Sequence, residues 1–191
     1  MSLNLITPPA YYPLTVDEAK EHLRVTTTDE DSYIQSLIVM ATEFVQNQTG
    51  RQLITATYEL TFTEMNLCNN WVKIPKGKLQ SIDSIKYIDA VGAEQTFSTS
   101  NYYVVGNDCG SVYFLSFPPY KANTPDAVKI RFTCGYGNGE DIPEVLKVGM
   151  KLLIGQFYKN REATSLNTVV ELPIGLDRLI SQYSLIRLGA E

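Results

Sequence analysis

Helical apolar repeats lie at the two ends of this 191-residue chain, and strand patterns fill its middle. Near the N-terminus, apolar residues recur three and four positions apart at Ile34, Leu37, Ile38 and Ala41, and Gly50 follows as a helix terminator. This spacing places the apolar side chains on one face of a helix of about 20 residues. The layout predicts an α+β fold, with a helical core and a mainly antiparallel β subdomain inserted in the middle.

Other helix boundaries carry their own signals. Thr15 with Glu18 three residues later forms a capping box and predicts a short helix to about Leu23. Thr28 or Asp29 is the expected cap of the next helix, because acidic residues crowd its first turn. Proline at a first helical position predicts a third helix from Pro143 to about residue 160 and a last short helix from Pro173.

The middle of the chain predicts five to seven strands, mostly antiparallel because their connections are short. The expected strands are 53–62, 71–74, 82–89, 102–105, 112–115 and 128–134, with a hairpin loop over 106–110. Residues 1–14 contain three prolines and are expected to be an extended arm that orders on docking. We therefore expect one domain over 1–191, made of N-terminal helices (1–51), a β-rich insertion (52–137) and C-terminal helices (138–191).

The third predicted helix is apolar on most sides, so it is expected to be a core helix or partly a subunit contact. The residues expected to make the core or an interface lie on the apolar faces of the second and third helices: Ile34, Leu37, Ile38, Ala41, Leu146, Met150, Leu153 and Phe157. Arg51 and Arg161 follow helix ends, where each either pairs with acids of the N-terminal half or is simply solvated.

Charge and cysteine content exclude several functions. The net charge is −5, and this excess of acid comes from residues 1–50, which hold two basic and seven acidic residues. Without a basic stripe, tight binding of DNA or RNA is not expected. Three distant cysteines and one histidine do not supply a zinc site, and free thiols indicate a reducing compartment. The start of the chain lacks the pattern of a signal peptide, and its apolar stretches are too short to span a bilayer.

No residue pattern in the sequence predicts a catalytic, cofactor-binding or metal-binding site. Gly135, Gly137 and Gly139 follow a strand and precede a helix, but their spacing is not that of a dinucleotide-binding loop, so a turn is the better interpretation. His22 has no nucleophile nearby in the sequence, and a solvated histidine is the simpler reading. The acids at 29–31 resemble half of a calcium loop, but Ile34 stands where glycine is required.

Segments spread over nearly the whole chain resemble, in order, the head–tail connector (adaptor) proteins of tailed bacteriophages, in particular the longer members with a β-rich insertion. The segments that carry this resemblance are PLTVDEAK at 13–20, DSYI at 31–34, TGR at 49–51, TYEL at 57–60, LQSI at 79–82, GYG at 135–137, IPE at 142–144, YKNR at 158–161 and LP at 172–173.

The resemblance implies a structural protein without catalysis or cofactor. It implies a homo-oligomeric ring of about a dozen copies in the virion neck, below the portal protein and next to tail or head-completion proteins. Before assembly such a protein lies in the host bacterial cytoplasm. DNA passes through the ring without being read, and we hypothesise that the local acidity helps the duplex to slide.

Two alternatives stay open at this point. The first is a DNA-packaging or capsid accessory protein that acts as a monomer or binds nucleic acid directly. The second is an enzyme for a small molecule, which would need a deep polar pocket with a carboxylate or His22 within reach of the ligand.

Overall fold

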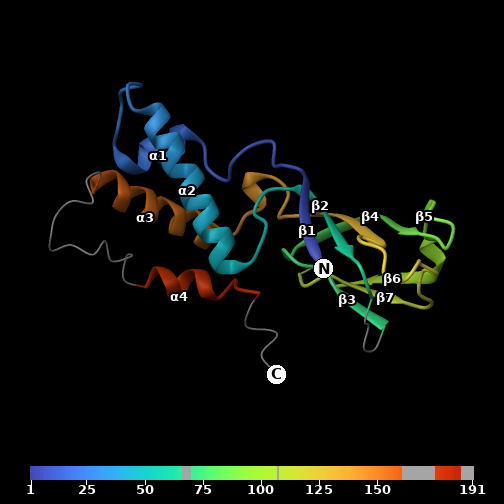
Figure 1. The fold of residues 1–191 in the computed structure, drawn as a ribbon. Coiled ribbons are helices and arrows are strands. Elements are labelled where there is room, and N and C mark those ends of the chain that lie inside the picture. The colour runs from blue at the N-terminus through green and yellow to red at the C-terminus, as the bar shows by residue number, and fades with distance from the viewer. Residues whose placement is uncertain (66–69, 107, 161–174, 186–191) are drawn as a thin grey trace, which may run out of the picture. The chain divides into compact units, whose positions relative to one another are not determined.

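The computed structural model describes residues 1–65, 70–106, 108–160 and 175–185. The chain divides into two compact units (Figure 1). Residues 1–9 and 55–135 form the first, here called the β unit, and residues 10–54 and 136–191 form the second, the helical unit. Both helices and antiparallel sheets are present, which confirms the α+β class. The division into one domain with an insertion over 52–137 stays a prediction.

A five-stranded antiparallel sheet forms one part of the β unit. Its strand order is β1-β2-β8-β4-β5. The strands are β1 (Ser2–Thr7), β2 (Ala56–Phe62), β8 (Val128–Cys134), β4 (Leu79–Ile88) and β5 (Glu94–Thr96). The central strand β8 therefore pairs with β2 on one side and with β4 on the other.

A second, three-stranded sheet has the order β3-β7-β6. Its strands are β3 (Trp71–Lys73), β7 (Ser111–Phe114) and β6 (Tyr102–Val105), and a short 3₁₀ turn, η2 (Thr99–Asn101), precedes β6. The hairpin predicted around residues 106–110 is confirmed, since β6 and β7 pair antiparallel.

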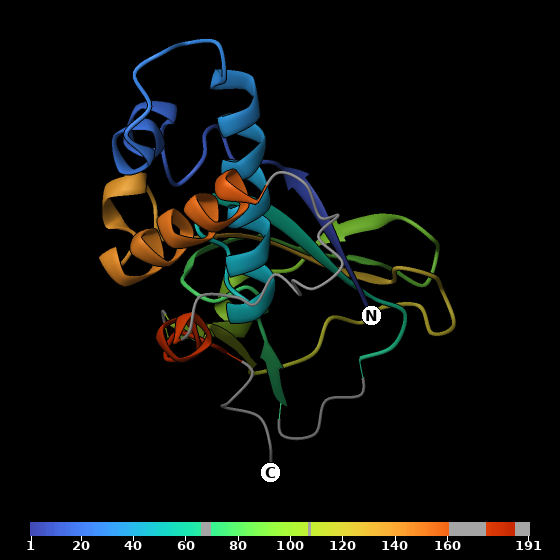
Figure 2. The same cartoon turned by 90° about the vertical axis from the view of Figure 1, so that its left-hand side faces the viewer.

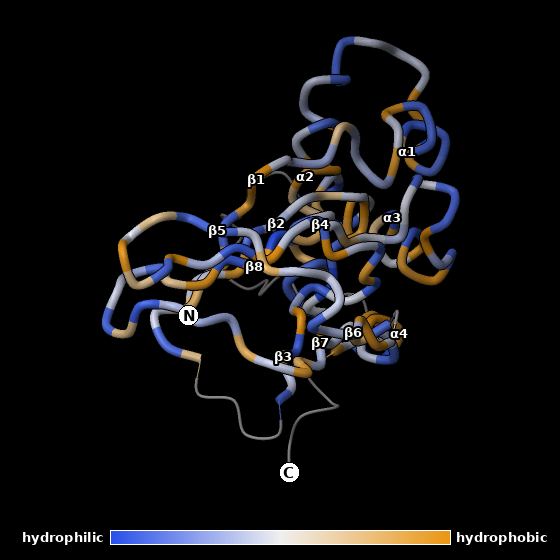
Figure 3. Tube along the Cα trace, turned by 90° about the vertical axis from the view of Figure 1, so that its right-hand side faces the viewer, coloured by the Kyte–Doolittle hydropathy of each residue, from blue (hydrophilic) through white to orange (hydrophobic). Residues whose placement is uncertain are grey.

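Alternation along the strands decides which side chains enter the β-unit core. On β2, Tyr58 and Leu60 are buried, and they lie opposite Phe132 and Ile130 of β8. The residues between them point to the other face of the sheet, because successive side chains of a strand alternate. Figure 3 shows polar and apolar residues interspersed along these strands, as expected for a sheet with one solvated face.

Four helices form the helical unit: α1 (Val16–Leu23), α2 (Asp31–Thr49), α3 (Glu144–Lys159) and α4 (Leu176–Ser181), with a 3₁₀ turn, η3 (Gly139–Asp141), before α3. Helix α3 contacts each of the other three helices, and Figure 2 shows it crossing α2. At Gly149 of α3 an added Cβ would lie 3.2 Å from Leu176 Cδ1, so this glycine permits the close approach of α4.

The capping box of α1 is confirmed. Thr15 Oγ1 accepts a hydrogen bond from the Glu18 N–H (3.2 Å), and the Glu18 carboxylate accepts one from the Thr15 N–H (2.7 Å). The bond from the Thr15 N–H is the largest cause of a lowered pKa at Glu18, and a hydrogen bond from the Thr15 hydroxyl to the same carboxylate adds to it.

The predicted cap of α2 is wrong. Neither Thr28 nor Asp29 caps the helix, which begins after Glu30 without a side-chain cap. A backbone turn, from the Asp31 N–H to the Thr28 carbonyl (3.2 Å), leads into the helix instead. The Asp31 carboxylate binds Lys20 Nζ of α1 at 2.8 Å and so links the two helices. It also lies in the first turn of α2, where the positive end of the helix dipole stabilises its negative charge. The predicted end of α2 is confirmed, since Gly50 has a φ of 69°.

Two of the predicted strands begin several residues from the expected start. Strand β2 begins at Ala56 and not at residue 53, because Leu53 and Ile54 pack in the core of the helical unit. Strand β4 spans Leu79–Ile88 and not 82–89.

Two further observed strands were not predicted. Residues 2–7 are not a free arm but strand β1, which pairs with β2 at the edge of the sheet. Ser2 Oγ and Thr61 Oγ1 lie 2.6 Å apart and add a side-chain link to this pairing. Strand β5 was not predicted, because its three residues are all exposed and carry no apolar alternation.

Candidate assembly surfaces

The residues predicted to make the core or an interface all belong to the helical unit. Seven of them are buried in its hydrophobic core: Ile34, Leu37, Ile38, Ala41, Leu146, Met150 and Leu153. Phe157 is partly buried and packs against this core. Because these side chains already pack within one copy of the chain, other residues must supply contacts between proteins.

Helix α3 leaves part of its apolar surface uncovered. Val148 is 44% exposed and Leu152 is 37% exposed, although the sequence predicted burial on most sides of this helix. The two residues are four positions apart and therefore lie on one face. They form a stripe, here called the α3 stripe, that is available to a partner protein.

A groove of about 600 Å³ adjoins the α3 stripe. Its lining comes from the end of α1 and the second half of α3: His22, Leu23, Arg24, Leu152, Gly155, Gln156, Tyr158 and Lys159. His22 thus lines a hollow, as an enzyme site would require, but the lining contains no carboxylate to orient its imidazole. The Tyr158 hydroxyl donates a hydrogen bond to the Glu30 carboxylate. With cations beside apolar carbon, the lining suits contact with a protein surface.

Arg51 is buried and links two segments of the helical unit. Its Nε donates to the Tyr183 carbonyl, and its backbone N–H donates to Thr49 Oγ1 at 3.2 Å. The Leu185 N–H donates to the Thr49 carbonyl at 2.8 Å, so the end of α2 holds the chain that follows α4. Pairing of Arg51 with N-terminal acids stays a prediction, and Arg161 lies outside the described residues.

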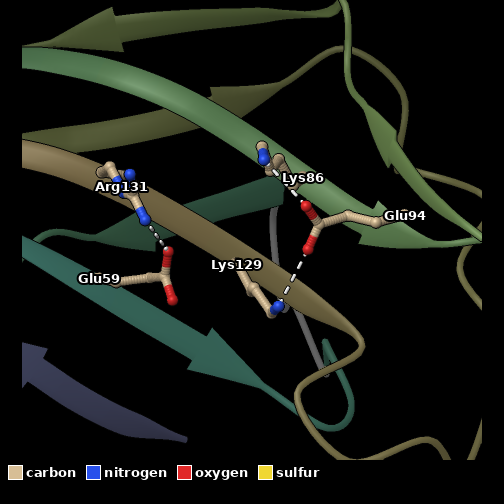
Figure 4. A network of polar contacts seen from close by, with 5 residues as sticks. All are labelled: Glu59, Lys86, Glu94, Lys129 and Arg131. Atoms are coloured by element: carbon tan, nitrogen blue, oxygen red, sulfur yellow. Dashed lines mark hydrogen bonds and ion pairs between the residues drawn. The ribbon is translucent and has the colours of Figure 1, made fainter.

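The solvated face of the five-stranded sheet carries paired charges (Figure 4). The Glu59 carboxylate of β2 binds the Arg131 guanidinium of β8 at 3.0 Å. Glu94 of β5 binds two ammonium groups, Lys86 Nζ at 2.8 Å and Lys129 Nζ at 2.9 Å. This network could not be predicted from the sequence, because it depends on the pairing of β8 with β2 and β4 and of β4 with β5.

Protonation in this network is set by the ion pairs. Hydrogen bonds from Lys86 and Lys129 lower the pKa of Glu94 to about 2, and the bond to Glu94 raises the pKa of Lys129. Each cation of the network is therefore paired with a carboxylate near neutral pH, although Lys86 and Lys129 share Glu94 and the network keeps one net positive charge. Such a face does not offer the unpaired positive charge that binds phosphates by releasing counterions.

Metal and thiol chemistry find little support in the described part of the chain. No group of three or more histidine, cysteine or acidic side chains there is placed to hold a metal ion. Burial raises the pKa of the Cys134 thiol to about 12, which keeps it from acting as a nucleophile. Among the described helices, none has the length and apolar character needed to cross a membrane.

Together, the described residues form an α+β protein with exposed apolar side chains on its helices and paired charges on its larger sheet. The sequence model of the Head completion protein family matches residues 14–169. The chain belongs to the Head completion protein family, which confirms the resemblance drawn from its sequence. It is a structural head–tail connector of a phage-like particle.

Solved structures share the fold over almost the whole chain. A chain described as the neck of an empty gene transfer agent (GTA) particle, computed with C6 symmetry, is 24% identical, with a TM-score of 0.79, over 96% of this chain and 95% of that one. A second, the neck of a native GTA particle computed with C12 symmetry, is 22% identical, with a TM-score of 0.72 and the same coverage. No curated protein matches the sequence.

Proposed function

We propose that this protein forms a closed homo-oligomeric ring of about a dozen copies in the neck of a phage or prophage particle. The ring lies below the portal protein and connects it to tail or head-completion proteins. The protein performs no catalysis. Membership of the Head completion protein family carries this proposal, and the symmetric neck particles that share the fold support it.

Exposed apolar side chains on the helical unit support assembly as the role. The α3 stripe joins a groove edged by Arg24 and Lys159, and Leu179 of α4 is also 37% exposed. Apolar surface bordered by polar residues is typical of protein interfaces. The buried residues of α2 and α3 give this surface a rigid support.

Passage of DNA through the ring is consistent with the charge distribution. The chain carries a net charge of −5, and the cations of the five-stranded sheet are paired with Glu59 and Glu94. A lumen lined by this sheet would repel phosphate weakly, because the cations that the structure describes in the network are paired with carboxylates. We therefore propose that the duplex passes without sequence-specific binding.

Mass measurement of the purified protein, alone and with its cognate portal assembly, tests the proposal. We expect a closed oligomer in at least one of the two samples, with a mass that is an integer multiple of the 21.4 kDa chain. A protein that stays monomeric even beside the portal contradicts it. Salt-dependent binding of a short DNA duplex by the monomer would favour the alternative, a DNA-packaging accessory protein.

A further inference from the structure

Three aromatic side chains form a row across the three-stranded sheet. Trp71 of β3 lies directly opposite Tyr113 of β7, and Tyr113 lies directly opposite Tyr103 of β6. Directly opposite residues point to the same face of a sheet. The rings of Trp71 and Tyr113 are tilted against each other, with centroids 4.9 Å apart. Trp71, Tyr113 and Tyr103 are here called the aromatic row.

The aromatic row is open to solvent and continues into further apolar surface. Trp71, the only tryptophan of the chain, is 43% exposed, and Tyr103 is 59% exposed. Val105 lies on the same face, two residues along β6 from Tyr103, and is 44% exposed, and Leu115, which directly follows β7, is 51% exposed. Exposed tryptophan and tyrosine are the residues that most often dominate the energy of a protein interface.

The edge of this sheet is also exposed and can pair with a partner. Strand β6 is an edge strand, and Tyr103, Val104 and Val105 are all exposed along it. A flat apolar edge promotes uncontrolled association unless another protein covers it. The aromatic row and the β6 edge therefore form one exposed apolar surface that a partner protein can cover.

Charge indicates what covers this surface. The β unit is neutral, with seven basic and seven acidic residues, whereas the helical unit has nine basic and fourteen acidic residues. Lys73 lies on the same face as the aromatic row, is exposed, and has no ion-pair partner among the described residues. The surface is thus aromatic and carries one positive charge at Lys73, which suits a partner surface with carboxylates.

The helical unit offers a matching surface near its N-terminal end. Asp17 and Glu21 are exposed, lie one turn apart on α1, and form no ion pair with the described part of the chain. Tyr11 and Tyr12, just before α1, are each 45% exposed. These four exposed residues, which lie within eleven positions of the sequence and are here called the N-terminal acidic surface, offer aromatic area and negative charge.

We propose that the aromatic row of one copy docks on the N-terminal acidic surface of the next copy. This inference rests on the proposed ring. The contact joins two different surfaces of the same chain, so it is head-to-tail, and repetition of such a contact gives a ring when the rotation between copies closes. Trp71 and Tyr103 supply the buried aromatic area, and Lys73 faces Glu21.

Substitutions on the exposed row test the contact. We expect the double variant Trp71→Ala/Tyr103→Ser, the row variant, to raise the concentration needed for half-assembly by roughly thirtyfold or more. Tyr103→Ser alone removes an exposed ring and should weaken assembly without unfolding the protein. Val91→Ser is the matched control, because Val91 is 86% exposed at a hairpin tip of the same unit, outside the proposed contact. Circular dichroism verifies that each variant is folded.

Mixing two assembly-deficient variants identifies the partner surface. The acid variant, Asp17→Asn/Glu21→Lys, is expected to lose rings as the row variant does. Mixed together, the two retain one intact pair of surfaces, the row of the acid variant and the acidic surface of the row variant. Native mass spectrometry should therefore show heterodimers but no rings.

Two further results separate the contact from the ring itself. Rings of the folded row variant at wild-type concentrations, or a mixture without heterodimers, overturn this contact and leave the ring proposal standing. A wild-type protein that forms no ring, alone or with the portal assembly, contradicts the ring and the contact together. Recovery of rings in the charge-reversed chain Lys73→Glu/Glu21→Lys supports the direct pairing of these two residues.

Discussion

Lys86 of β4 and Lys129 of β8 lie directly opposite each other, and both ammonium groups bind the carboxylate of Glu94 on β5. Like charges in this position destabilise a sheet. The Glu94 carboxylate at the sheet edge offsets this repulsion by binding both ammonium groups, and so it links the three strands β5, β4 and β8. The short edge strand β5, which has no buried residue, is thereby tied to the centre of the sheet.

Replacing Glu94 by Gln should lower the stability of the β unit. The change removes two partly exposed ion pairs and leaves the two lysines facing each other, so we expect a loss of about 0.5–1.5 kcal/mol at low salt. The loss should shrink at high salt, because salt screens the remaining repulsion. Urea unfolding followed by the fluorescence of Trp71 measures it, and Glu64→Gln, at an exposed position of the same unit, is the control. Equal losses at both salt concentrations would argue against an electrostatic cause.

The same carboxylate predicts a dependence of stability on pH. The pKa of Glu94 is about 2 in the folded protein against an ordinary value of 4.5, so the unfolded chain takes up this proton first as the pH falls. Its stabilisation is complete above about pH 5 and is lost progressively toward pH 2. Glu18 and Asp89, whose pKa values are also lowered, act in the same direction. Urea midpoints between pH 7 and pH 3 should fall less steeply for Glu94→Gln than for the wild type; parallel curves would contradict the assignment.

Gly110 should not tolerate a side chain. An added Cβ would lie 2.4 Å from Leu79 Cδ2 and 2.6 Å from Leu79 Cβ, so Gly110→Ala should cost about 1–3 kcal/mol through overpacking. Leu79→Ala removes the Cδ2 contact but keeps the Leu79 Cβ, so the double variant should be somewhat less destabilised than the sum of the two single variants. Gly139→Ala, where the Cβ would be 3.4 Å from the Pro13 carbonyl oxygen, is a milder comparison. Additive losses in thermal unfolding would show that the outer carbons of the Leu79 side chain are not the obstacle.

Replacing Leu153 of α3 should affect stability, whereas replacing its neighbour Leu152 should affect assembly. Leu153 is fully buried, so Leu153→Ala should destabilise the helical unit by about 2–5 kcal/mol. Leu152 is 37% exposed on the α3 stripe, so Leu152→Ala should cost less than about 1 kcal/mol and act mainly on assembly. Circular dichroism melting curves and the mass of the assembled species separate the two effects. If Leu152→Ala assembles like the wild type, the α3 stripe is not a contact surface.

The amino-acid sequence predicted the elements that have strong local signals. Strands β6 and β8 lie at the predicted positions, 102–105 and 128–134, because β-branched and aromatic residues are bounded there by glycine- or proline-containing turns. The capping box of Thr15 and the terminator Gly50 fixed the ends of α1 and α2 in the same way. Such elements can be predicted from sequence because neighbouring residues alone determine their backbone conformation.

What the sequence missed depends on contacts between distant residues. Strand β1 exists because β2 supplies its hydrogen bonds, and only Leu3 of its apolar residues packs against the core of the β unit. The network around Glu94 needs the register of β4 with β8, and the aromatic row needs that of β3, β7 and β6. The apolar count of α3 likewise did not distinguish the buried Leu153 from the exposed Leu152, because both faces of the helix are apolar.

Electron microscopy of the protein bound to its cognate portal assembly tests the central claim most directly. We expect averaged end views to show a closed ring with an open centre, and side views to show an added layer on the portal that is absent from the portal alone. Side views identical to those of the free portal, with this protein recovered only as separate monomers, would contradict the account.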